Sequence, residues 1–325
     1  MTASPLDGGE KGRQVAAAGG YGAAVPDLPG FTVRPCTPGD AATVLALVRA
    51  DEERASGQPS RLVEGSVRDW WQVVDLANDS WLLTRAGADA PVAAGWLEPA
   101  GDAVVAPLVG GEPEVVRALV DLAEQRATAK GARRLQHAVL LPHPVAEELL
   151  AGRGYRDVRH FYEMAVELDG PPPAPVLPPG LTLQPFAPDD ARAFHAAIGE
   201  AFTDHWEFHP LPFDEWWQMR SSDPDVDFSW WFLVRDRDEV AAAMRNVPGR
   251  GGGVYVGTLG VRRPWRGRGL AKALLAHTFA RAWEAGFRRV TLGVDASSPT
   301  GATALYRSVG MTVEQESALW ETTLA

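Results

Sequence analysis

A proline-rich stretch in the middle of the chain constrains its fold more than any other feature. The segment DGPPPAPVLPPG, residues 169–180, contains six prolines. Proline lacks a backbone N–H and has a fixed φ, so this segment cannot lie inside a helix or a sheet and suits an extended linker. The chain has 325 residues, enough for two domains of ordinary size. We therefore predict two folded units of nearly equal length, separated by a linker at 170–180.

The two pieces begin and end alike. FTVRPCTPGDAATVLALV, from residue 31, resembles LTLQPFAPDDARAFHAAI, from residue 181; each reads as an alternating strand, a proline, a helix-capping acid and a helical stripe. GRGYRDVRHFYEMAVEL, from residue 152, matches RSVGMTVEQESALWETTL, from residue 307, as a helix that ends at glycine and two alternating strands. Such a repeat indicates two diverged copies of one fold. We place them at 30–169 and 181–325.

Composition excludes several classes of protein. Hydrophobic residues make up 46% of the chain and charged residues 22%, which is typical of globular proteins. No stretch approaches the ~20 apolar residues of a membrane helix, and the Gly- and Ala-rich residues 1–29 predict a disordered leader. Cys36 is the only cysteine, and the net charge of −11 disfavours a general nucleic-acid binder. We expect a cytoplasmic monomer or homodimer that binds neither membranes nor nucleic acid.

Hydrophobic periodicity in the second half predicts a mixed α/β fold. The expected helices lie near 188–202 and 212–220, at about 268–285, and in a short segment that ends at Gly310. The expected strands are 181–185, 229–235, 239–247, 253–261 and 288–295, with a closing pair after Gly310. This order predicts a mixed sheet with helices on both faces.

The sequence RGRG, residues 266–269, stands directly before the long helix. The first turn of a helix has unpaired backbone N–H groups and the positive end of the dipole, so this corner favours an anion. Taken alone, the motif also fits a helix start with arginines facing water. A dinucleotide-binding fingerprint fails because Lys272 occupies its third glycine position, and the chain contains no Walker motif.

Two stretches of the second half resemble the GCN5-related N-acetyltransferase (GNAT) family. RGRGLA, residues 266–271, resembles the family signature R/Q-x-x-G-x-G/A, and it follows a strand that ends in LGV. VDASSPTGATALYRSVGM, residues 294–311, resembles the family's strand, short helix and LY…GF element. The resemblance implies an α/β fold of two tandem acyl-CoA N-acyltransferase (GNAT) domains, each with a mostly antiparallel sheet and a central pair of splayed parallel strands. This architecture is similar to the mycothiol synthase branch of the family.

The resemblance also implies acetyl-CoA as cosubstrate, without a metal, in the gap between strands 253–261 and 288–295. The implied cofactor-binding residues are Leu259, Gly260, Val261, Arg266, Gly267, Arg268, Gly269, Leu270, Ala271 and Ser298, the last at a position where relatives often have asparagine. The first half departs from the signature: its loop reads LVGGEPEVVRAL, residues 108–119, and Glu112 and Glu114 would repel a pyrophosphate. We therefore predict a degenerate first domain and a catalytic second domain.

Tyr306 is the catalytic side chain that the resemblance points to most directly. A tyrosine hydroxyl, with a reference pKa near ~10, could donate a proton to the departing thiolate of coenzyme A. Many relatives also use a glutamate on the strand before the loop as general base, but here that strand offers Tyr255 and no acid. We name Glu239 as the candidate base and leave Asp295, His205 and His209 as alternatives.

The acceptor region of the family corresponds here to residues 203–231, which contain seven acids, one arginine and five tryptophans. Acids and aromatic faces suit a cationic amine, although the tryptophans also suit a core. The predicted acceptor-binding residues are Asp204, His205, Trp206 and His209. The predicted function is acetyl transfer to the primary amine of a small cationic acceptor. Two alternatives stay open: acetylation of a cysteinyl pseudo-disaccharide, as in mycothiol synthase, and a non-catalytic acetyl-CoA sensor.

Overall fold

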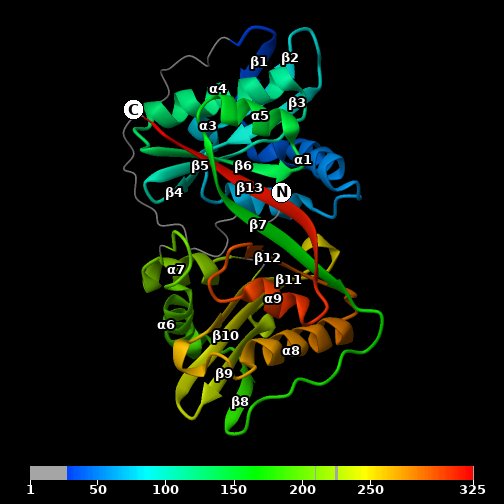
Figure 1. Cartoon of the computed structure of the whole chain (residues 1–325), viewed down its shortest axis with the longest axis vertical. Helices are drawn as coiled ribbons and strands as arrows, with labels where there is room; N and C mark the ends of the chain where they lie inside the picture. Colours follow the sequence, from blue (N-terminus) through cyan, green and yellow to red (C-terminus); the bar gives the residue numbers. More distant parts are fainter. Residues whose placement is uncertain (1–27, 209, 224–225, 325) are drawn as a thin grey trace. The chain divides into compact units, whose positions relative to one another are not determined.

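The computed structural model describes residues 28–208, 210–223 and 226–324. The predicted leader lies almost wholly outside these ranges, as does His209. The described chain forms two compact units (Figure 1). The first, here called the N-terminal unit, comprises residues 28–161 and 315–324, and the second, the C-terminal unit, comprises 162–314.

The N-terminal unit places helices on both faces of its strands. Its helices are α1 (Ala41–Ser56), α2 (Glu64–Trp71), α3 (Leu76–Asp79), α4 (Pro113–Ala129) and α5 (Pro144–Gly152). Its strands are β1 (Phe31–Arg34), β2 (Ser80–Arg85), β3 (Pro91–Trp96), β4 (Glu98–Ala100), β5 (Ala103–Pro107), β6 (Arg134–Leu141) and the first part of β7 (Arg156–Glu167). One hydrophobic core lies under α4 and α5 and a second under α1 and α2.

The C-terminal unit repeats this plan. Its helices are α6 (Ala191–Phe202), α7 (Phe213–Ser221), α8 (Leu270–Glu284) and α9 (Ala302–Arg307). Its strands are β8 (Leu181–Pro185), β9 (Trp231–Asp236), β10 (Glu239–Pro248), β11 (Val254–Val261) and β12 (Arg289–Asp295), hydrogen-bonded in the order β12-β11-β10-β9-β8. The α8 and α9 helices pack into one core with β11 and β12, while α6 and α7 pack into another with β9 and β10. The predicted mixed sheet with helices on both faces is confirmed.

The repeated N-terminal motif folds the same way in both units. A short 3-10 turn precedes α1 and α6, at Pro38–Asp40 and Pro188–Asp190. In the first, Asp40 accepts a hydrogen bond of 2.8 Å from the amide of Thr37; in the second, Asp190 accepts one of 3.0 Å from the amide of Ala187. Each aspartate therefore caps the 3-10 turn that precedes its helix. It makes no side-chain capping bond to α1 or α6 themselves, so the predicted capping acid acts one turn earlier than expected.

The ends of the two copies differ from the prediction of two strands each. The chain forms one strand of 12 residues in each place, β7 and β13 (Thr312–Thr323). Neither segment contains a glycine, proline or asparagine to form a tight turn, so the alternation continues through the predicted break.

The last strand groups with the N-terminal unit. In an antiparallel register, β13 pairs with β6 from Glu316 opposite Leu141 to Thr323 opposite Arg134. The Arg134 guanidinium donates to Glu321 over 2.8 Å. The sequence assigned all of 181–325 to one domain, and local patterning could not indicate this pairing, because its partners are 187 residues apart. The domain bounds 30–169 and 181–325 remain a prediction of which segments fold independently.

His160 ties β7 to β13 within the N-terminal unit. Its Nε2 lies 2.7 Å from Asp157 Oδ2 and its Nδ1 lies 2.6 Å from Glu316 Oε1. Burial alone lowers the pKa of His160, but the two carboxylates outweigh it and raise that pKa above its ordinary value of 6.5. The charged imidazolium is the form that donates to both carboxylates.

We expect His160→Gln to change the pH dependence of stability. A raised native pKa stabilises the fold fully below the unfolded value near 6.5, and this contribution is lost as pH rises through the native pKa. Wild type should therefore exceed the variant in free energy of unfolding at about pH 5, with the difference shrinking toward pH 9. Urea denaturation across this range measures it. A difference that grows with pH would contradict the prediction.

Candidate active site

The central parallel strands of the C-terminal unit separate soon after they begin. β11 pairs with β12 at Val254–Val290 and Tyr255–Thr291, and the register records no further pair between them. The rest of β11 stays paired with β10 along its other edge. Within the described residues, the second half of β11 therefore presents one backbone edge to no other strand. The corresponding strands of the N-terminal unit, β5 and β6, pair over the whole of β5.

A bulge marks the point of separation. The register of β10 against β11 shifts between Arg245, opposite Thr258, and Asn246, opposite Val256, so Gly257 is the extra residue. A Cβ on Gly257 would lie 2.6 Å from Nη2 of Arg245, so a side chain there would have to displace that guanidinium. Bulges are common next to active sites, because they redirect the chain and end regular pairing.

The loop after β11 leaves a row of amides unpaired. Gly267 and Gly269 have φ of +74° and +85°, and a Cβ on either would meet nothing within 4 Å. Gly269 is the N-cap of α8, so the first amides of this helix cannot bond within it. In the part of the chain that the structure describes, the amides of residues 267–272 have no backbone or side-chain acceptor. Together with the helix dipole, they form an anion-binding corner.

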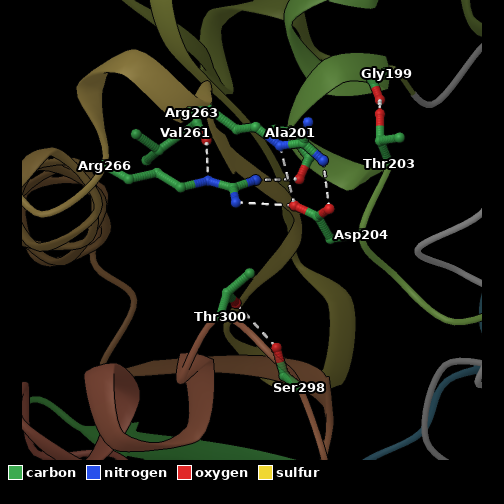
Figure 2. A network of polar contacts seen from close by, with 9 residues as sticks. All are labelled: Gly199, Ala201, Thr203, Asp204, Val261, Arg263, Arg266, Ser298 and Thr300. Carbon is green, nitrogen blue, oxygen red and sulfur yellow. Dashed lines mark hydrogen bonds and ion pairs between the residues drawn. The ribbon is translucent and has the colours of Figure 1, made fainter.

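Three arginines before this corner are bound to α6 and its C-terminal end. Arg266 donates to the Val261 carbonyl (3.2 Å), to the Ala201 carbonyl (2.9 Å) and to Asp204 (3.0 Å). Arg263 also binds Asp204, and Arg262 donates to Glu200 over 2.6 Å. We call this network the arginine brace; Figure 2 shows its Arg263, Arg266 and Asp204 members converging.

The arginine brace pairs the charge of Asp204 with the charges of Arg263 and Arg266. Hydrogen bonds first from Arg263 and then from Arg266 hold the pKa of Asp204 below its ordinary value. The carboxylate predicted to bind a cationic acceptor is thus neutralised by arginines of the cofactor loop. Sequence reasoning could not find this contact, because 62 residues separate Asp204 from Arg266.

Two cations beside the corner are available to an anion. Arg268 and Lys272 are exposed, and among the described residues neither has a hydrogen-bond or ion-pair partner. Across the gap, Ser298 follows β12, and its hydroxyl lies 2.9 Å from that of Thr300 (Figure 2). The predicted cofactor residues thus lie on the free half of β11, the start of α8 and the loop after β12.

Tyr306 in α9 packs into the core shared with α8, β11 and β12. Its side chain is 9% exposed, and burial raises the pKa of its hydroxyl to about 12. No described residue gives this hydroxyl a hydrogen bond. Because a buried tyrosine hydroxyl usually has a hydrogen-bond partner, this one is an exception. Its hydrogen can therefore be donated to a bound ligand.

The candidate bases lie on different elements of the C-terminal unit. Glu239 begins β10, is 64% exposed and binds Arg262 over 3.1 Å. Six residues of strand, about 20 Å, separate it from Arg245 at the bulge. Asp295 ends β12 and accepts a 2.8 Å hydrogen bond from the amide of Ser297, while the His205 ring stacks on Phe202 at 4.3 Å. The role of a base at any of these positions stays a prediction.

The tryptophans of residues 203–231 mostly form a core. Trp216, Trp230 and Trp231 are 4%, 4% and 1% exposed. The rings of Trp216 and Trp231 are 6.1 Å apart, and Trp217 stacks on Phe228 at 5.6 Å. Packing thus explains these rings. Trp206, the tryptophan of the predicted acceptor set, is half-buried and does not belong to this core.

Two other kinds of feature are absent from the described ranges. No cluster of three or more His, Cys, Asp or Glu side chains there could hold a metal ion. None of the helices in those ranges is long and apolar enough to cross a membrane.

The splayed parallel strands, the bulge and the amide-lined helix start together form one candidate site for a ligand that carries an anionic group. Residues 191–311 match the family model described as "Acetyltransferase (GNAT) family". The mycothiol acetyltransferase of Thermobispora bispora is 32% identical over 289 residues, which cover 85% of this chain and 94% of that protein. The chain belongs to the GCN5-related N-acetyltransferase family, as a tandem member, and is an N-acetyltransferase.

Solved structures agree with this assignment. A GCN5-related N-acetyltransferase from Sphaerobacter thermophilus superposes with a TM-score of 0.79 at 30% identity, over 90% of this chain and 96% of that one. A tandem GNAT protein from the clavulanic acid biosynthesis pathway superposes with a TM-score of 0.66 at 18% identity, over 91% and 99%. The second shares the fold, so the tandem architecture expected from the internal repeat is confirmed.

The brace predicts that Arg266 and Arg268 respond differently to lysine. Arg266 acts through a three-way fork that lysine cannot reproduce, whereas exposed Arg268 offers only charge. Arg266→Lys should therefore weaken acetyl-CoA binding about tenfold, the effect of losing one or two charge-assisted hydrogen bonds. Arg268→Lys should bind like wild type, and Arg268→Ala should not. Calorimetric Kd values for acetyl-CoA measure this. If lysine were tolerated equally at both positions, the arginine brace would have no role in acetyl-CoA binding.

Proposed function

We propose that the chain transfers the acetyl group of acetyl-CoA to the primary amine of a small-molecule acceptor, at one site in the C-terminal unit. The observation that supports this most is the coincidence of unpaired amides at 267–272 with the free edge of β11. An acyl donor with a pyrophosphate at one end and a thioester at the other matches both features.

The residues present fit such a donor. The amides at the start of α8 would hold the pyrophosphate, since Gly267 and Gly269 allow close approach. Arg268 and Lys272 would add charge at the phosphates. The free backbone edge at Leu259 and Val261 would bind the pantetheine arm and polarise the thioester carbonyl. Ser298 would contact the donor from the loop after β12.

Tyr306 would serve the leaving group. Its hydroxyl is protonated at neutral pH, because burial raises its pKa to about 12. It could therefore donate a proton to the coenzyme A sulfur as the thioester bond breaks. The acceptor amine arrives largely as ammonium and must lose a proton before it attacks.

The N-terminal unit lacks the features that support donor binding. β5 and β6 stay paired as far as Pro107 opposite Ala138, and the Leu108 amide continues with a 3.1 Å bond to the Ala138 carbonyl. At the start of α4, Glu112 and Glu114 both bind Arg85. We therefore propose that this unit has a structural or substrate-shaping role.

Of the candidate acceptors, one has support from the names of the relatives. Proteins named mycothiol acetyltransferase match over most of this chain, which favours the cysteinyl pseudo-disaccharide acceptor. Fewer residues support a cationic acceptor, because Asp204 is bound to arginines and most of the tryptophans lie in the core. The two candidates share the essential group, a primary amine that is protonated in water.

Acetyl transfer to a panel of amines tests the proposal. The panel should contain the cysteinyl pseudo-disaccharide, simple alkylamines and polyamines, with coenzyme A measured by chromatography because the first acceptor carries its own thiol. We expect acetylated product with at least one member, and most with the cysteinyl acceptor. Tight acetyl-CoA binding without turnover across the panel would instead favour the sensor alternative.

A further inference from the structure

The central strands of the C-terminal unit have two distinct faces. Val254 and Val256 of β11 pack with α8 and α9 on one face. Side chains alternate along a strand, so Tyr255 belongs to the opposite face. A Cβ on Gly260 would touch side chains of α6, which places α6 over that opposite face as well.

An open position lies on the Tyr255 face where β11 and β12 part. Gly293 of β12 is exposed, although its neighbours Leu292 and Val294 are buried. A Cβ on Gly293 would lie 3.4 Å from the hydroxyl oxygen of Tyr255. The Tyr255 hydroxyl therefore borders an exposed spot at Gly293, which follows soon after Thr291, the last β12 residue that is paired with β11.

The ring of Tyr255 is held in place. Its side chain is 6% exposed, and the Arg250 guanidinium lies over the ring, 4.4 Å from its centroid. Arg245 covers the neighbouring Gly257. A ring fixed in this way gives its hydroxyl a defined position, as orientation of a reactant requires.

The two tyrosines of the site lie on opposite faces. Tyr306 belongs to the core under α8 and α9, which fills the first face. An acceptor therefore reaches the separated strands from the second face, where Tyr255 lies. The β11 sequence VYVGTLGV contains no acid, so its polar side chains are the hydroxyls of Tyr255 and Thr258. A phenol oxygen can accept a hydrogen bond from an amine N–H.

We infer that Tyr255 is the acceptor-side residue of the reaction: its hydroxyl accepts a hydrogen bond from the acceptor's amino group and points the nitrogen lone pair toward the acetyl carbon. The inference rests on the proposed function. In the step, the N–C bond forms and the C–S bond breaks; nitrogen loses a proton to solvent, and sulfur takes one from Tyr306, which solvent restores. Tyr255 orients the nitrogen and gains or loses no proton.

Tyr255→Phe tests the inference, with Tyr162→Phe as a matched control. Tyr162 is a half-buried tyrosine of the same unit, packed against the core of α8. Losing one hydrogen bond to the acceptor should lower kcat/KM for the amine about tenfold. The acetyl-CoA Kd should stay at the wild-type value, because the α8 helix, whose start would hold the donor's phosphates, packs on the opposite face of β11. The variant should also remain folded at the assay temperature, as thermal melting shows. Tyr162→Phe should match wild type in all of these measurements.

Two failures can be told apart. If wild type acetylates no amine, the proposed function fails. If wild type is active and Tyr255→Phe keeps its kcat/KM for the amine, the inference about Tyr255 is wrong while the function stands. The inference would also be overturned if the acetyl-CoA affinity of Tyr255→Phe fell by as much as its kcat/KM, or if the variant were partly unfolded at the assay temperature. Either result would mean that the role of Tyr255 is structural. Gly293→Val, which crowds the hydroxyl, should reproduce the acceptor-specific defect.

Discussion

Gly269→Trp should abolish acetyl-CoA binding, raising its Kd by about a thousandfold or more. Gly269 caps α8, and a side chain there would enter the space that the unpaired amides face, where a Cβ meets nothing within 4 Å. The new indole ring would fill the anion-binding corner. The backbone φ of +85° at residue 269 would also strain a tryptophan by about 1–2 kcal/mol. Calorimetry with acetyl-CoA measures the effect, and thermal melting shows whether the unit stays folded.

The internal repeat supplies a matched control for this variant. Glu112 caps α4 as Gly269 caps α8, but with an ordinary φ of −83°. We expect Glu112→Trp to bind one equivalent of acetyl-CoA per chain with wild-type affinity. Two equivalents in wild type, or binding that survives Gly269→Trp, would show that the phosphate corner is not the site that the loop sequence indicates.

The amide corner could be found from sequence because all its parts are local. RGRGLA places two glycines and a helix start within six residues, and the left-handed φ values of Gly267 and Gly269 are what such a loop needs. The amphipathic stripe of the following helix fixes its buried face, which α8 confirms. Features set by neighbours in the chain are therefore the ones that sequence reasoning reached.

The brace and the acceptor side depend on contacts between distant segments. The Asp204 carboxylate reads as an acceptor ligand when only its acidic neighbours are considered, yet folding brings Arg263 and Arg266 onto it. In the same way, Trp216 and Trp231 read equally well as a ligand box or a core, and only packing separates the two. Residue type alone cannot say which partner a charge or a ring will meet.

Tyr255 shows the opposite case, in which an absence in the sequence was informative. Because β11 contains no acid, the candidate base was placed at Glu239 on the neighbouring strand, and Tyr255 was noted only as the residue that β11 offers instead. What sequence could not supply was Gly293, whose lack of a side chain opens the space next to that hydroxyl. Its neighbours alternate as an ordinary buried strand, so the glycine carries no signal until the strands are seen to part.

Tyr306→Phe should lower kcat about a hundredfold, the usual scale for losing a general acid, without weakening acetyl-CoA binding. The variant should also melt at or above the wild-type temperature. The Tyr306 hydroxyl has no partner in the described chain, so its removal costs no hydrogen bond and relieves the burial of a polar group. Activity lost without stability lost is the pattern of a group retained for chemistry.

The pH dependence separates this role from a merely structural one. Burial raises the pKa of Tyr306 to about 12, so its neutral, proton-donating form dominates at every lower pH. The rate ratio of wild type to Tyr306→Phe should therefore stay constant between about pH 6 and 10, where any change in rate comes from deprotonation of the acceptor ammonium. Steady-state kinetics across that range measure the ratio. A ratio that falls toward one as pH rises would mean that Tyr306 ionises inside this window, and an unchanged kcat would remove it from the mechanism.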